Sequence, residues 1–165
     1  MASTKTKGDL AELIVAADLA RRGYQVSFPY GEDCDYDLIV DRNGRLERVQ
    51  VKHSDSKGQV IRVQCYSSSL TNGKVKHRKP YTQSTVDWIA VYDPRTDRCY
   101  YVSSDEFASG RYQLSLRIAA TRNAQSKGVR FAEDYLDLDP PRRRGMEPAG
   151  LEPAPSGLQS QRSPN

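Results

Sequence analysis

A turn at Asn43-Gly44 constrains the fold of this chain more than any other feature of its sequence. The pair stands between two apolar runs, and Asn-Gly in such a setting favours a two-residue β-hairpin. The turn fixes the strand register, so Arg42 should pair with Arg45, and Asp37 should lie opposite Gln50. Because side chains alternate along a strand, one face of the hairpin is predicted to join the core. That face carries Leu38, Val40, Val49 and Val51.

The opposite face of the same hairpin is polar. Asp37 and Gln50 face each other there, and Lys52 lies diagonally from Asp37. Folding does not require a carboxylate, a carboxamide and an ammonium group on one surface, and together they indicate metal and phosphate chemistry. The alternative interpretation is an exposed ion pair between Asp35 and Lys52, which would contribute little to stability.

A helix is predicted over residues 10–22, ending at Gly23, because glycine commonly follows a helix C-terminus. Its residues are apolar on nearly every side, a pattern typical of a buried helix. Glu12 shares its face with Ala16 and Leu19, and a buried carboxylate is costly unless it is paired or bound to a metal. We therefore expect Glu12 to approach the polar face of the hairpin. One apolar face of the helix is predicted to consist of Leu10, Leu13, Ile14 and Ala17.

The rest of the chain predicts an α/β protein with a mixed central β-sheet flanked by helices. The segment 67–84 is interpreted as an exposed arm or loop with at most a short helix. Residues 1–139 are expected to form one domain, and 140–165, rich in Pro, Gly, Ser, Gln and Arg, a disordered tail. Further strands are expected at 25–29, 59–66, 86–93, 99–102 and 112–118, and short helices at 103–108 and 131–138.

The composition favours a soluble cytoplasmic protein with no membrane partner. The mean hydropathy is −0.74, and no apolar run approaches the roughly 20 residues of a membrane span. The first seven residues lack the apolar core of a secretion signal. The three cysteines are odd in number and match no zinc spacing, which suits a reducing compartment. A net charge of +4 mildly favours an anionic partner.

The polar residues suit phosphodiester hydrolysis with a divalent cation, which polarises phosphorus and activates water. Mg²⁺ prefers oxygen ligands and takes few of them from protein. Asp37, Gln50, the main-chain carbonyl of Val51 and Glu12 are the candidate ligands. Lys52 is the candidate for stabilising charge on the phosphate or orienting the attacking water.

At these residues the chain resembles the PD-(D/E)XK nuclease superfamily. The match is to Glu12 on the leading helix, to Asp37 at the start of a strand, and to Gln50-Val51-Lys52 on the next strand. It looks closest to the homing endonucleases of group I introns that carry Gln-X-Lys in place of Glu-X-Lys. The resemblance extends over roughly residues 5–138 and includes the segments 7–12, 86–92, 100–102, 117–118 and 123–125.

This resemblance implies a restriction-endonuclease-like core and Mg²⁺-dependent cleavage of double-stranded DNA at a long recognition site. It also implies a homo-oligomer, either a dimer or a tetramer. Two positions depart from the family pattern: Tyr36 rather than Pro precedes Asp37, and Gln50 replaces the usual acid. The second change removes one negative charge and should weaken metal binding unless Glu12 or Asp35 compensates.

Two other functions remain open. The same core cuts branched DNA in junction resolvases and repair nucleases, and a catalytically inactive DNA-binding protein could be built on it. A preference for a four-way junction over a linear site would distinguish a resolvase or repair nuclease from a homing endonuclease. DNA binding without metal dependence and without cleavage would support the inactive DNA-binding protein.

A basic stretch with a nearby tyrosine supplies the candidate DNA contacts. Side chains of these types contact phosphates, sugars and base edges, although charge runs are also common on solvated loops. The candidates are Lys74, Lys76, His77, Arg78, Lys79 and Tyr81.

Overall fold

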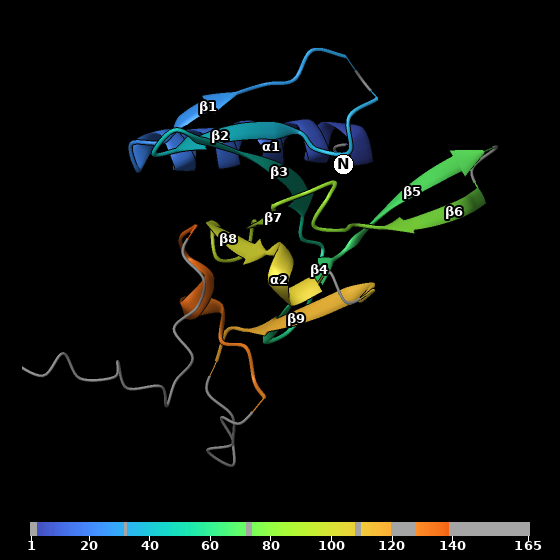
Figure 1. Ribbon diagram of the computed structural model, residues 1–165. Coiled ribbons are helices and arrows are strands. Elements are labelled where there is room, and N and C mark those ends of the chain that lie inside the picture. The colour runs from blue at the N-terminus through green and yellow to red at the C-terminus, as the bar shows by residue number, and fades with distance from the viewer. Residues whose placement is uncertain (1–2, 32, 72–73, 108–109, 120–127, 139–165) are drawn as a thin grey trace, which may run out of the picture.

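The computed structural model describes residues 3–31, 33–71, 74–107, 110–119 and 128–138. Within them, a five-stranded mixed sheet has the order β1-β2-β3-β7-β8 (Figure 1). Strands β3 and β7 are parallel, and the other neighbours are antiparallel. The expected mixed α/β architecture is confirmed, whereas the predicted tail at 140–165 and the domain boundary lie outside the described residues. The strands are β1 Gln25–Ser27, β2 Leu38–Arg42, β3 Arg45–His53, β7 Trp88–Asp93 and β8 Arg98–Ser103.

The β2–β3 hairpin has the register that its turn predicts. Arg42 pairs with Arg45, and Asn43 and Gly44 adopt φ angles of 55° and 83°. Two successive positive φ angles are the backbone of the two-residue turn that Asn-Gly favours, and its twist matches the flanking strands. The predicted core face is confirmed, with three of its residues fully buried and the last 6% exposed: Leu38, Val40, Val49 and Val51.

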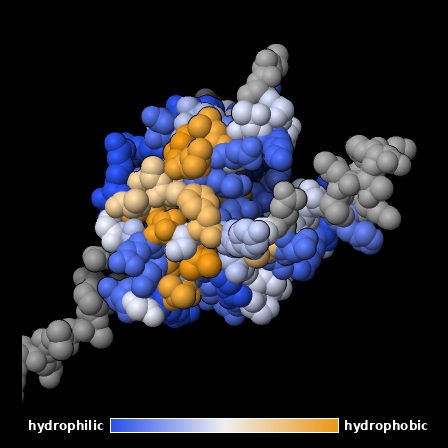
Figure 2. Space-filling view, turned by 90° about the horizontal axis from the view of Figure 1, so that it is seen from above, coloured by the Kyte–Doolittle hydropathy of each residue, from blue (hydrophilic) through white to orange (hydrophobic). Residues whose placement is uncertain are grey.

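Helix α1, Thr4–Arg21, begins earlier than predicted because the Ser3 side chain accepts a hydrogen bond from the Thr6 amide at 3.1 Å and caps it. The prediction that this helix is buried on nearly every side is wrong. The helix packs against the sheet through Ala11, Val15 and Leu19, one turn apart, whereas Leu10 and Leu13 remain 51% and 61% exposed. The sheet covers one side of the helix only, so apolar residues on the other side stay on the surface. Figure 2, which looks onto this side, shows them as an apolar stripe.

Each face of the central sheet carries its own apolar cluster. The α1 side includes Val49 and Val51. Gln50 and Lys52 alternate with them and therefore lie on the other side, where β4 Val60–Gln64 pairs with β9 Gln113–Arg117. The polar face of the hairpin is thus enclosed between the central sheet and the segments that follow β3.

Segment 67–84 is exposed as expected at most of the residues whose side chains are described, with Tyr81 buried, but most of its backbone forms strands. Strands β5 Tyr66–Thr71 and β6 Lys74–Pro80 pair antiparallel and project from the body of the molecule as a two-stranded arm (Figure 1). A ribbon that packs neither face on the core needs no apolar alternation, so the sequence gives no strand signal there. We call β5 and β6 the arm.

The shorter elements differ from the predictions mainly at their ends. Helix α2 spans Ser104–Phe107, within the predicted 103–108. The helix predicted at 131–138 is a 3₁₀ turn over Ala132–Tyr135, held to α2 by a hydrogen bond from the Tyr135 hydroxyl to Glu106 at 2.7 Å. In the part of the chain that the structure describes, we find no helix of the length and apolarity that crossing a membrane requires.

Candidate active site

The hairpin places Asp37 directly before β2, beside the middle of β3. The Asp37 amide donates to the Val49 carbonyl at 3.0 Å, which extends the strand pairing by one residue. Its carboxylate accepts hydrogen bonds on Oδ2 from the Val51 amide, at 2.7 Å, and from the Gln50 side chain. The predicted apposition of Asp37 and Gln50 is therefore present, and two donors fix the carboxylate.

The acidic groups of the site are held in unfavourable surroundings for negative charge. Burial raises the pKa of Asp37, although the Val51 amide, the Lys52 charge and the Gln50 amide oppose the shift. The pKa of Glu12 is raised by burial and then by the negative charges of Asp37 and Asp9. Glu12 therefore comes close enough to Asp37 for the two charges to interact, as the sequence predicts. A bound cation would relieve this repulsion.

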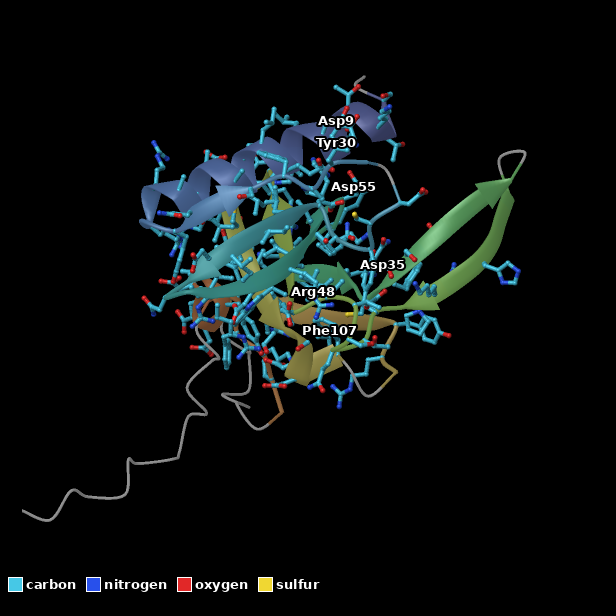
Figure 3. The ribbon with its side chains drawn as sticks, turned by 45° about the horizontal axis from the view of Figure 1, so that its top comes forward. Asp9, Tyr30, Asp35, Arg48, Asp55 and Phe107 are labelled. Carbon is cyan, nitrogen blue, oxygen red and sulfur yellow. The ribbon has the colours of Figure 1, made fainter. Side chains whose placement is uncertain are left out.

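Lys52 lies on the same face as Gln50, and its ammonium group contacts Tyr81. Nζ donates to the Tyr81 hydroxyl at 2.9 Å and lies 5.2 Å from the centre of the ring. Burial lowers the pKa of Lys52, and the charge of Asp37 opposes the shift. Asp35, the alternative partner expected for Lys52, instead accepts from Lys79 of the arm at 2.7 Å (Figure 3).

The donor set at this site consists of hard oxygen atoms. The Gln50 carboxamide lies between the Asp37 carboxylate and the Val51 carbonyl and donates to both through Nε2, and Glu12 is near enough to Asp37 for their charges to interact. Among the described residues, no three His, Cys, Asp or Glu side chains gather as metal ligands. Mg²⁺ keeps several of its waters and is usually held by only one or two carboxylates, so a site with few charged oxygen ligands suits it. The residues present therefore fit the ion.

The sequence matches the family model described as PD-(D/E)XK endonuclease over residues 2–138. The chain belongs to this family. Among solved structures it is similar to a bacterial homing endonuclease, I-Ssp6803I, with 27% sequence identity and a TM-score of 0.64. That match covers 76% of this chain and 86% of the other. No curated protein sequence matches the chain. The resemblance drawn from Glu12, Asp37 and the Gln-X-Lys triplet is confirmed, and the protein is a nuclease.

A partly buried ion pair that the sequence does not predict joins β3 to the segment before β7. Arg48 donates through Nε to Asp87 at 2.9 Å and through a terminal nitrogen to the Gln83 carbonyl at 3.1 Å, and it also contacts the Ser84 carbonyl (Figure 3). Burial alone would raise the pKa of Asp87, but the hydrogen bonds from Arg48 hold it below its usual range. Arg48 precedes Gln50 by two residues on the same strand face. That spacing is the signal that could have found it.

The structure divides the predicted DNA contacts into two groups. His77, Arg78 and Lys79 are exposed on β6 of the arm, and the Arg78 guanidinium lies 5.1 Å from the ring centre of Tyr66. Tyr81 is only 3% exposed, and its hydroxyl contacts Lys52. Lys74 and Lys76 belong to the same strand, and their side chains lie outside the described part of the structure.

Proposed function

We propose that the protein is a Mg²⁺-dependent, site-specific endonuclease of the homing type that hydrolyses double-stranded DNA. The observation that carries the proposal is the convergence of Asp37, Gln50 and Lys52 on one enclosed strand face, with Glu12 within electrostatic reach of Asp37. The similarity to a bacterial homing endonuclease supports the homing type. We also propose that it acts in the cytoplasm, as its composition suggests.

The chain's own residues divide the work of phosphodiester hydrolysis. Asp37, Gln50, the Val51 carbonyl and Glu12 would hold Mg²⁺, which when bound polarises the phosphate and lowers the pKa of a water. The Val51 amide and the Gln50 side chain keep Asp37 oriented before any cation arrives. The Lys52 ammonium stabilises the negative charge that develops on the phosphate oxygens.

The arm is the proposed DNA-gripping element. A two-stranded ribbon fits the major groove of DNA, and β6 presents three exposed basic or imidazole side chains, His77, Arg78 and Lys79. The ion pair between Lys79 and Asp35 joins the base of the arm to the loop that leads into Asp37. DNA held on the arm would therefore lie next to the hydrolytic residues.

Cleavage of both strands calls for two active sites, and the described chain carries one Asp37–Gln50–Lys52 site. We propose that a second copy of the chain supplies the second site and docks on the exposed apolar side of α1, where Leu10 and Leu13 are 51% and 61% exposed (Figure 2). An apolar face of this kind commonly marks an interface, and self-association of like surfaces gives a symmetric dimer.

The function is tested by incubating the protein with supercoiled plasmids that carry genomic fragments lacking the chain's own gene, with Mg²⁺ or with a chelator. A synthetic four-way junction is offered in parallel. We expect linearisation at one sequence, with Mg²⁺ only, and none by a Lys52→Ala preparation. Preference for the junction would favour a resolvase or repair nuclease. DNA binding without cleavage in any divalent metal would leave an inactive DNA-binding protein.

Replacing Arg78 with glutamine is expected to weaken DNA binding by about fivefold to tenfold and to reduce the slope of log affinity against log salt by about one unit, because one phosphate contact is lost. Fluorescence anisotropy over a salt series measures both. The matched control is Arg98→Gln, an exposed arginine of β8 outside the arm. Equal slopes for both variants would remove Arg78 from the interface.

Replacing Leu13 with glutamate is expected to convert the assembly into monomers, because a charge would be buried in the proposed interface. Light scattering coupled to size-exclusion chromatography measures the mass. Leu46→Glu is the control, since Leu46 is 68% exposed at the start of β3, away from α1. An unchanged mass for the Leu13 variant would place the interface elsewhere.

A further inference from the structure

Tyr81 is a buried tyrosine whose hydroxyl accepts a hydrogen bond from the ammonium of Lys52. The two are joined by a 2.9 Å hydrogen bond, and the ammonium also lies 5.2 Å from the ring centre, within range of a cation–π interaction. The side chain is 3% exposed, so it does not serve as a surface contact for DNA. Burial and the negative charges of Asp37 and Asp35 raise the pKa of the phenol, which therefore stays neutral.

The backbone around Tyr81 is held at both ends. Its amide donates to the Cys65 carbonyl at 2.9 Å, at the base of the arm, where β6 has just ended. The residues that follow are fixed by Arg48, which donates to the carbonyls of Gln83 and Ser84. The phenol thus projects from a rigid support, as a group that places another side chain must do.

A lysine needs such a partner because its four-carbon chain has many rotamers and its ammonium is a point charge without directional preference. Left to electrostatics alone, Lys52 would be drawn onto the Asp37 carboxylate and would compete there with a cation. In the described residues, Nζ donates to the Tyr81 hydroxyl, and no ion pair joins it to Asp37.

We propose that Tyr81 is a positioning residue that holds the Lys52 ammonium apart from Asp37, at the place where it meets the scissile phosphate. The inference rests on the proposed nuclease function of the Asp37–Gln50–Lys52 site. Tyr81 acts through Lys52 and does not touch the substrate.

Tyr81→Phe keeps the ring and removes only the hydroxyl. We expect kcat for DNA cleavage to fall by about 10-fold to 100-fold, the scale of a small misplacement of a reacting group, with KM and the dissociation constant for DNA unchanged. The matched control is Tyr100→Phe, since Tyr100 is also 3% exposed and its hydroxyl bonds Thr96 at 3.0 Å, away from Lys52. A raised KM with unchanged kcat, or equal effects of the two variants, would overturn the proposal.

A second measurement does not depend on activity. The Nζ–H signals of lysines are followed by ¹⁵N nuclear magnetic resonance in the metal-free protein, at low temperature and mildly acidic pH, with Lys52→Met to assign the signal. We expect a protected Lys52 signal in the wild type and in Tyr100→Phe, and its loss in Tyr81→Phe. An unchanged signal in Tyr81→Phe would overturn the proposal. A wild type that shows the protected signal but does not cut DNA would instead refute the nuclease function and leave the contact intact.

Discussion

Replacing Asp37 with asparagine is expected to lower the rate of Mg²⁺-dependent DNA cleavage by at least about 10³-fold. A metal-bound transition state gains several kcal/mol from the cation, and each 1.36 kcal/mol corresponds to about a factor of ten in rate. Asparagine has nearly the same shape and can still accept the Val51 amide bond that Asp37 accepts at 2.7 Å. The fold should therefore survive. Single-turnover cleavage measures the loss of rate, and calorimetric titration measures the accompanying loss of Mg²⁺ affinity.

The same substitution should change how stability depends on pH. Because the pKa of Asp37 is raised on folding, the folded protein binds a proton more readily than the unfolded chain, and stability falls as pH rises from the ordinary aspartate pKa through the raised one. The raised pKa of Glu12 acts in the same direction. Metal-free Asp37→Asn should therefore show a shallower decline of its thermal midpoint over this acidic range.

Magnesium provides the sharpest contrast between the two proteins. It should raise the thermal midpoint of the wild type, because it binds the folded state, and leave Asp37→Asn unchanged. The control is Asp33→Asn, an exposed aspartate in the loop before the site, which should behave as the wild type in every assay. Equal stabilisation of the wild type and Asp37→Asn by Mg²⁺ would mean that Asp37 is not a ligand.

The sequence predicts the hairpin and its two faces well because both are local. Asn43-Gly44 fixes the turn, alternation fixes the faces, and the register then brings Asp37 to Gln50 without any knowledge of distant segments. The placement of Glu12 near Asp37 also followed from a local pattern, a carboxylate on an apolar helix.

The features that the sequence did not predict depend on distant partners. Only the position of the sheet decides which side of a helix with apolar residues on nearly every side is buried, and Leu13 is left exposed for that reason. The Arg48–Asp87 pair and the Lys52–Tyr81 contact join residues 39 and 29 positions apart, and no local periodicity reveals them. The sequence makes Tyr81 a candidate DNA contact because tyrosine is a residue type that meets sugars and base edges, whereas in the fold it is buried against Lys52.

Replacing Gln50 with glutamate is expected to destabilise the metal-free protein. Gln50 is 9% exposed, and its amide donates to Asp37 and, at 3.3 Å, to the Val51 carbonyl. Glutamate would lose both donations and add a second negative charge beside Asp37. Two unit charges about 4 Å apart repel by roughly 4 kcal/mol at an effective dielectric constant near 20, and proton uptake would relieve part of this. A net loss of about 2 kcal/mol would lower the thermal midpoint by roughly 4–8 °C.

Magnesium should narrow the difference in stability between the wild type and Gln50→Glu. A third carboxylate in the ligand set is expected to tighten Mg²⁺ binding by about tenfold, since affinity rises with ligand charge, and the variant should recover most of the lost thermal midpoint as the cation is added. Gln64→Glu is the control, because it adds the same charge at an exposed position of β4. Were Mg²⁺ affinity unchanged in Gln50→Glu, Gln50 would lie outside the ligand set. The opposite signs of the two effects give the glutamine a physical role: its amide holds Asp37 in place while the site is empty, at the cost of a weaker grip on the metal.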